Sequence, residues 1–109
     1  MDAPKIREII SIYRKYLKEW PVVPRDLPHN LRAPSSLGAY AHCLGMLDKM
    51  EKFLEEGRFE KAMRWLGFIQ GVFWCTGAFS LEELMNHSRP DEATTERLAD
   101  SLFRFKIID

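Results

Sequence analysis

The chain has 109 residues, of which 46% are hydrophobic and 29% are charged, and its 16 Lys and Arg residues balance its 16 Asp and Glu residues. This composition is typical of a folded globular protein and excludes a disordered one, and a net charge of zero excludes the overall basic footprint of a nucleic-acid-binding protein. Because the chain also lacks the ~20-residue apolar run that a membrane span needs and a secretion-signal pattern at its start, we expect residues 1–109 to form one cytoplasmic domain.

The first helix is predicted within residues 1–20. Apolar side chains recur at spacings of three and four from Ile6 to Trp20, with charged residues between them, which is the pattern of an amphipathic helix. Pro21 ends it, because proline lacks an amide donor and clashes with the preceding turn. Residues 21–36 contain four prolines and predict an extended connection, of a length typical of functional or mobile segments.

A second helix is predicted over residues 37–56, with Ser35 or Ser36 as its N-terminal cap. Gly57 ends it, because glycine readily adopts the left-handed conformation that terminates helices. The third helix, residues 58–76, follows after a very short turn. The second and third helices must therefore run antiparallel.

The third helix contains the densest apolar and aromatic run of the chain. At ~100° per residue its large side chains fall on two separate stripes. The stripes are Phe59, Ala62, Met63, Leu66, Ile69 and Phe73, and Trp65, Phe68, Val72 and Cys75. A helix that is apolar on most of its circumference must be buried on most of it, so we expect residues 58–76 to form a central helix that the others surround.

Two further helices are predicted, over residues 81–87 and 91–105. Ser80 is followed three residues later by a glutamate, which is the capping-box pattern of a helix start. Pro90 and the acidic residues after it suit the first turn of the last helix. The apolar positions of that helix are Leu98, Leu102 and Phe105. The prediction is an all-α fold of four to five helices around the third, with no sheet.

The main candidate site is a strip between the two apolar stripes of the third helix. It consists of Glu60, Arg64, Gly67, Gly71 and Trp74. A glycine inside a helix costs ~1 kcal/mol relative to alanine, so two of them indicate that something approaches the helix closely. One interpretation is tight packing of another helix of the same chain. The functional interpretation is a groove for a partner helix or a planar ligand, with Trp74 as a stacking wall and Arg64 as an anion contact.

Gln70 lies among apolar residues of the third helix, where leucine would be expected. A buried amide without hydrogen-bond partners costs ~1 to 3 kcal/mol. Either Gln70 bonds backbone carbonyls near residues 21–36, which is a structural role, or it faces a pocket and contacts a ligand.

Catalytic and metal motifs are weak. Asp48, Glu51 and Glu55 share one face of the second helix and superficially resemble the magnesium-binding helices of all-α nucleotide pyrophosphatases, but no second carboxylate pair with that spacing follows. The histidines and cysteines share no metal-ligand spacing, and there is no phosphate loop or nucleophile elbow. We therefore predict no metal and no cofactor, and we expect Cys43 and Cys75 to be buried free thiols.

Three motifs carry a resemblance to a known group. They are RWLGFIQG at residues 64–71, followed by Trp74, then SLEEL at residues 80–84 and NHSRP at residues 86–90. Over roughly residues 36–92 the chain resembles a group of small, uncharacterised accessory proteins encoded by tailed bacteriophages. The resemblance implies an infected bacterial cytoplasm as the setting. It also implies a host-takeover or anti-defence factor, which binds a host protein or sequesters a signalling nucleotide.

The sequence thus favours a non-catalytic binding protein that inhibits or redirects a host bacterial protein through aromatic and arginine contacts on a helical surface. The alternative is a sponge that binds a signalling nucleotide at the interface of a homo-oligomer. Its contacts would be Arg64, Gln70, Trp74, His87 and Arg89. A small all-α nucleotide hydrolase is the third hypothesis. Direct nucleic-acid binding is disfavoured, because no helix combines strong basicity with a groove-reading face.

Overall fold

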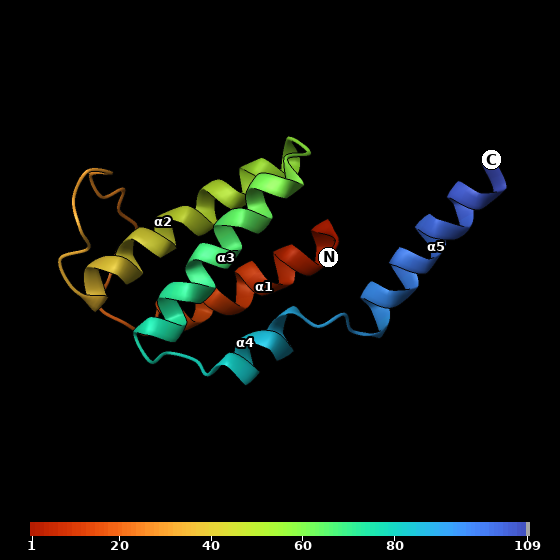
Figure 1. The fold of residues 1–109 in the computed structure, drawn as a ribbon. Helices are drawn as coiled ribbons and strands as arrows, with labels where there is room; N and C mark the ends of the chain where they lie inside the picture. The colour runs from red at the N-terminus through yellow and green to blue at the C-terminus, as the bar shows by residue number, and fades with distance from the viewer. Residues whose placement is uncertain (109) are drawn as a thin grey trace.

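Five helices make up the fold in this computed structural model, which describes the backbone of residues 1–108 and the side chains of residues 1–100. They are α1 (Ala3–Leu17), α2 (Ser36–Glu55), α3 (Phe59–Cys75), α4 (Leu81–Ser88) and α5 (Glu92–Ile108) (Figure 1). Residues 1–108 contain no strand. The prediction of an all-α fold without a sheet is therefore confirmed. None of these helices is long and apolar enough to cross a membrane.

The helix ends follow local sequence signals. Ser35 caps α2 by accepting a hydrogen bond from the Gly38 amide at 3.0 Å. Gly57 adopts a φ of 75°, which permits the tight turn into α3. Ser80 starts α4 with both bonds of the predicted capping box, at 3.0 and 3.1 Å.

The first helix ends at Leu17, three residues earlier than predicted. The Glu19 and Trp20 amides bond to carbonyls three residues back instead of four, which tightens the chain into a turn. Trp20 precedes Pro21, and a residue before proline is disfavoured in the helical conformation. The helix therefore ends before the proline and not at it.

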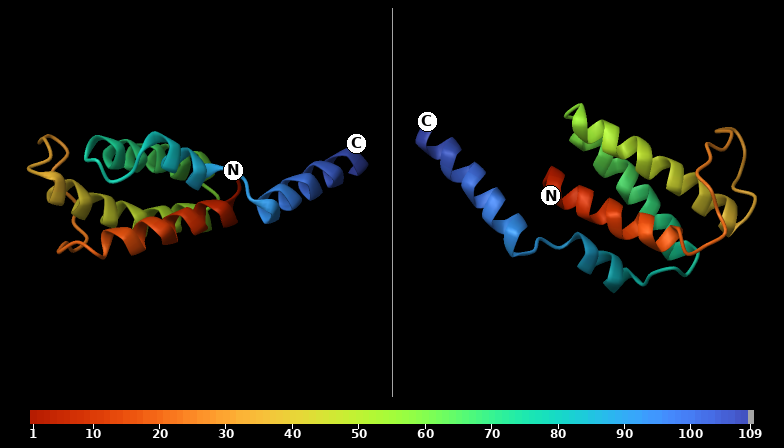
Figure 2. Two further views of the ribbon diagram at one scale, coloured as in Figure 1. Left: turned by 90° about the horizontal axis from the view of Figure 1, so that it is seen from below. Right: turned by 180° about the vertical axis from the view of Figure 1, so that it is seen from behind.

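The helices α1, α2 and α3 lie side by side and enclose the core (Figures 1 and 2), with α2 in contact with both of the others. As predicted, α2 and α3 run antiparallel on either side of the short turn. The largest fully buried side chains of these three helices are Ile6, Ile9, Ile10, Tyr13, Leu17, Cys43, Leu47, Met50, Ile69 and Phe73. The helix α4 packs across α1 and adds Leu84 to this core.

The prediction that the third helix is buried on most of its circumference is wrong. The buried residues of α3 are Ala62, Leu66, Ile69 and Phe73. Phe59, Met63 and Phe68 are exposed by 47%, 44% and 55%. The helices α1, α2 and α4 contact the buried side of α3, whereas on the opposite side a Cβ atom added to Gly67 or Gly71 would meet nothing within 4 Å. The apolar residues there remain in contact with solvent.

The last helix, α5, leaves the three-helix bundle (Figures 1 and 2). Its first turns are held at the start of α1, where Arg97 donates two hydrogen bonds to the Asp2 carboxylate, at 2.7 and 3.2 Å. Lys5 of α1 is buried where α1 meets the start of α5, and its ammonium lies 3.6 Å from the Asp91 carboxylate. Thr94 is fully buried beside them. The predicted apolar positions Leu102 and Phe105 lie outside the residues whose side chains are described.

Candidate functional site

The predicted strip on α3 is open to solvent. A Cβ atom added to Gly67 or Gly71 would meet nothing within 4 Å. Since no helix of the described chain packs against these glycines, tight packing within the chain does not explain them. The interpretation that remains from the sequence is that the two glycines leave room for a partner helix or a planar ligand.

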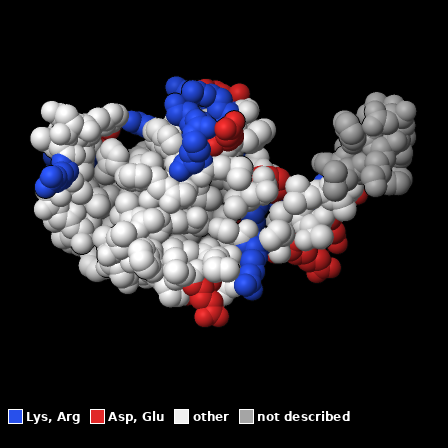
Figure 3. Space-filling model, in the orientation of Figure 1, with Lys and Arg blue, Asp and Glu red and all other residues white. Residues whose placement is uncertain are grey.

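Exposed aromatic side chains flank the two glycines. Phe68 is 55% exposed and Trp74 is 53% exposed. We call Gly67, Phe68, Gly71 and Trp74 the outer face of α3. These four residues line a shallow hollow of about 580 Å³ that extends to the start of α2. Figure 3 shows a broad area without charged side chains on this side of the molecule, with charged groups gathered towards its edges.

Arg64 lies at the N-terminal edge of the outer face. Its guanidinium is 3.2 Å from the Glu60 carboxylate one turn earlier, and its side chain is exposed. Such a surface ion pair is worth ~1 kcal/mol or less. The guanidinium can therefore leave Glu60 for a stronger partner at low cost, which is consistent with the predicted role of Arg64 as an anion contact.

Gln70 points away from the outer face, into an internal hydrogen-bond network. Its amide nitrogen donates to Ser88 Oγ at 2.9 Å and to the Tyr13 hydroxyl oxygen at 3.1 Å. The prediction that Gln70 bonds backbone carbonyls near residues 21–36 is wrong, because its partners are side chains of α1 and α4. Its role is still structural, since it joins α3 to both of these helices.

His87 belongs to the same network. Its Nδ1 atom lies 3.0 Å from the Tyr13 hydroxyl. Because the Tyr13 oxygen accepts from Gln70, the Tyr13 hydrogen is free to be donated to His87 Nδ1, which leaves the ring hydrogen on Nε2. Burial raises the pKa of Tyr13, which keeps its hydroxyl protonated. His87 also packs edge-on against Phe79, with ring centres 4.9 Å apart.

The seven residues predicted as a binding site thus divide into three groups. Arg64, Gly67, Gly71 and Trp74 share one side of α3. Gln70 and His87 lie in the internal network between α1, α3 and α4. Arg89 is exposed at the end of α4, where its backbone amide bonds to the Asn86 carbonyl. In a single chain the structure does not bring all seven together.

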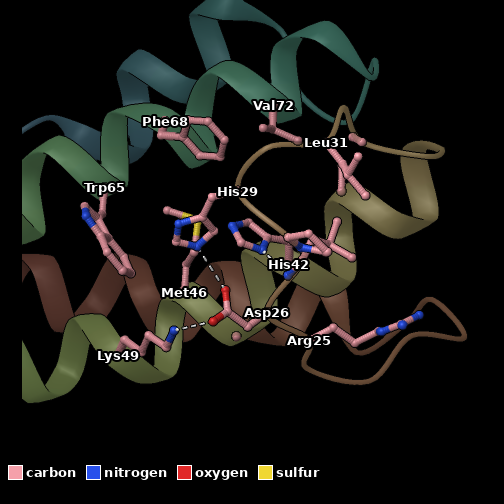
Figure 4. Close-up of a pocket in the computed structure, with 15 residues that line it drawn as sticks. Arg25, Asp26, His29, Leu31, His42, Met46, Lys49, Trp65, Phe68 and Val72 are labelled. Atoms are coloured by element: carbon pink, nitrogen blue, oxygen red, sulfur yellow. Dashed lines mark hydrogen bonds and ion pairs between the residues drawn. The ribbon is translucent and has the colours of Figure 1, made fainter.

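A second cavity, of about 540 Å³, lies next to the outer face and was not predicted from the sequence (Figure 4). It lies between residues 25–33 of the proline-rich connection, α2 and α3. Its apolar wall includes Met46, Trp65, Phe68 and Val72, and its polar lining is Arg25, Asp26, His29, His42 and Lys49. Phe68 and Val72 also line the shallow hollow, so the two spaces adjoin.

Three contacts hold the connection against α2 and so shape this cavity. The Arg25 amide donates to the Ala41 carbonyl at 3.1 Å, and the Leu27 amide donates to His42 Nδ1 at 3.1 Å. At Gly45 a Cβ atom would lie 2.8 Å from the Arg25 carbonyl oxygen. Only glycine lets the connection approach so closely. A glycine inside the second helix was the one sequence signal for this contact.

Asp26 supplies the negative charge of the cavity. Its carboxylate lies 3.4 Å from His29 Nε2 and 3.4 Å from Lys49 Nζ. The hydrogen bond from His29, together with that from Lys49, lowers the pKa of Asp26. Asp26 is therefore ionised at neutral pH, and Lys49 compensates its charge.

Two of the three acidic residues of the second helix, Asp48 and Glu51, have a structural partner. The Arg14 guanidinium lies 2.8 Å from Asp48 and 3.0 Å from Glu51, so these carboxylates join α2 to α1. No group of three or more potential metal ligands occurs among the described residues. These observations leave the superficial resemblance to magnesium-binding helices without support.

The two cysteines differ in their environments. Cys43 is a buried free thiol, as predicted, and burial raises its pKa to about 12. A thiol with so high a pKa is unreactive at neutral pH. Cys75 is also free but is exposed at the end of α3, which contradicts the prediction that both are buried. It lies next to Trp74, on the uncovered side of α3.

Comparison of this chain with protein-family models, with curated proteins and with solved structures gives no match.

Proposed function

We propose that the protein is a non-catalytic binding protein that inhibits or redirects a host bacterial protein through the outer face of α3. The observation that carries this proposal is the exposure of Phe68 and Trp74 on either side of two glycines with open space above them. The bacterial setting is supported by the resemblance of the RWLGFIQG and NHSRP motifs to those of phage accessory proteins.

The arrangement suits a helical or flat partner. Aromatic side chains supply most of the binding energy in many protein interfaces, and they are enriched together with arginine at the centres of such surfaces. Glycines four residues apart allow another backbone to come close to the helix axis, so that Phe68 and Trp74 can contact the partner on both sides. Arg64 at the edge adds an anion contact. We therefore expect a partner with an apolar helix face and an acidic residue beside it.

The two alternatives receive less support. A nucleotide sponge that uses Gln70 and His87 together with Arg64 and Trp74 would have to break the network around Tyr13 or assemble its site from several chains. A hydrolase that uses Asp48 and Glu51 would have to release both carboxylates from Arg14. No contact in the described part of the chain favours either rearrangement.

Recovery of a partner from bacterial lysate tests the proposal. We expect the wild-type protein to recover one dominant bacterial protein, and we expect Trp74→Ala and Arg64→Ala to reduce that recovery at least tenfold. Met85→Ala is the matched control, because Met85 is a 58% exposed apolar residue on α4, away from the outer face. All variants must first show the wild-type unfolding midpoint. Equal recovery by Trp74→Ala and the wild type would contradict the proposal.

A further inference from the structure

We propose that the cavity between the proline-rich connection, α2 and α3 is a binding site for a small aromatic carboxylate, with the ring N–H of His42 as its hydrogen-bond donor. This site adjoins the outer face of α3 and shares Phe68 with it, but the assignment does not depend on the function proposed above. Its size, its donor and its charge each support a different part of the assignment.

The size and walls of the cavity suit a ring system. Its volume of about 540 Å³ lies within the range of ~300 to 1,000 Å³ typical of small-molecule sites. Trp65 and Phe68 of α3 and Met46 of α2 line it (Figure 4). Aromatic rings and a thioether are favourable neighbours for another aromatic ring. The apolar part of the ligand is therefore expected between α2 and α3.

The hydrogen-bond donor follows from the tautomer of His42. Since Nδ1 accepts the Leu27 amide hydrogen, the hydrogen of the neutral ring must be on Nε2. Among residues 1–100, whose side chains are described, none accepts a hydrogen bond from Nε2, and no fully buried side-chain nitrogen or oxygen there lacks a partner. The Nε2 atom is therefore accessible, on a ring that lines the cavity. It is a donor in a fixed orientation, available to an acceptor on a ligand.

The charge of the lining favours an anionic acceptor. Arg25 and Lys49 contribute two positive charges to the lining and Asp26 one negative charge, so the formal excess is positive. The Lys49 ammonium lies at the cavity, whereas the Arg25 side chain points away from it and attracts an anion only at longer range (Figure 4). Asp26 already has partners in Lys49 and His29. A carboxylate on the ligand would accept from His42 Nε2 and would compete with Asp26 for the exposed Lys49 ammonium. This combination selects an aromatic carboxylate over a neutral aromatic compound.

The test is a titration of the full-length protein with 2-naphthoate, followed by the amide and indole signals of its ¹H–¹⁵N NMR spectrum. We expect shifts at the Trp65 indole and at the Leu27 and Phe68 amides. The neutral analogue 2-naphthylmethanol should bind about tenfold more weakly. An absence of shifts at these residues up to millimolar 2-naphthoate would overturn the proposal, and so would equal binding of the two compounds.

Two variants test the donor and the charge separately. His42→Asn retains an oxygen that can accept from the Leu27 amide but removes the ring N–H, and we expect about tenfold weaker binding of 2-naphthoate with the Leu27 signal retained. Lys49→Ala should also weaken binding, whereas Arg7→Ala removes a charge from the exposed side of α1 and should have no effect. Wild-type affinity for 2-naphthoate in both His42→Asn and Lys49→Ala would overturn the proposal.

Discussion

The two sides of α3 show how differently similar residues behave on one helix. Phe73 is fully buried on the inner side, where its ring centre lies 4.9 Å from that of Tyr13 and 5.4 Å from that of Phe79. Phe68, five residues earlier, is 55% exposed on the outer side. The inner side stabilises the bundle because α1, α2 and α4 cover it. The outer side leaves about half of each aromatic side chain in solvent, so Phe68 and Trp74 contribute little to stability and remain available to a partner.

Truncation of the two phenylalanines gives the largest expected contrast. Phe73→Ala should lower the free energy of unfolding by ~3 to 5 kcal/mol, because it leaves a cavity among packed rings. Phe68→Ala should lower it by less than ~1 kcal/mol, because over half of that side chain is already in water. Urea denaturation of both variants measures the difference. Similar losses in the two variants would show that the outer side is also covered.

The inner side includes one polar position, Gln70, which leads to the second prediction. Tyr13→Phe removes the hydroxyl that bonds both Gln70 and His87, and it should cost ~1 to 3 kcal/mol because two partly buried groups lose a partner. In a Gln70→Ala background the same change should cost less, since one of the two bonds is already absent. Additive losses in this double-mutant cycle would contradict the network.

The helix starts and the helical content were predictable from the sequence because their causes are local. Ser80 and Glu83 specify a capping box by their spacing alone, and Gly57 specifies a left-handed turn between two helical patterns. The extent of burial around α3 was not predictable in the same way. The period of apolar residues shows which side chains share a side of the helix. What covers that side is decided by distant elements of the chain, and the last of these, α5, leaves the bundle and does not cover α3.

Only part of the candidate site was predictable, because local patterns do not show contacts between distant parts of the chain. Gly67, Gly71, Trp74 and Arg64 share a side of one helix, so their proximity follows from their spacing. The partners of Gln70 lie 57 and 18 residues away in the chain, and no local pattern indicates them. The cavity beside His42 was missed because it forms only when the proline-rich connection folds back over Gly45.

The glycines of α2 and α3 provide the third prediction. Gly45→Ala would place a methyl group 2.8 Å from the Arg25 carbonyl oxygen. Overpacking of this kind costs ~1 to 3 kcal/mol and outweighs the ~1 kcal/mol gained in helix propensity, so we expect a net loss of about 1 kcal/mol. The connection should also separate from α2, with faster hydrogen exchange of the Arg25 and Leu27 amides. Unchanged exchange rates would show that the connection is held by other contacts.

The matched substitution on the outer side has the smallest expected effect and the opposite sign. Gly71→Ala should raise the free energy of unfolding by ~0.5 to 1 kcal/mol, because alanine is the better helix former and the added methyl group meets nothing within 4 Å. Gly67→Ala should behave in the same way. Thermal unfolding measures both, and a lower midpoint for either variant would mean that a neighbouring group lies over the glycine.

The most direct measurement combines stability and binding in one variant, Gly71→Leu. Leucine is a good helix former, and its side chain would fill the open space between Phe68 and Trp74. We predict an unfolding midpoint at or above that of the wild type together with loss of the bacterial partner from lysate pull-downs. Wild-type recovery of the partner by this stably folded variant would contradict the assignment of the outer face of α3 as the binding surface.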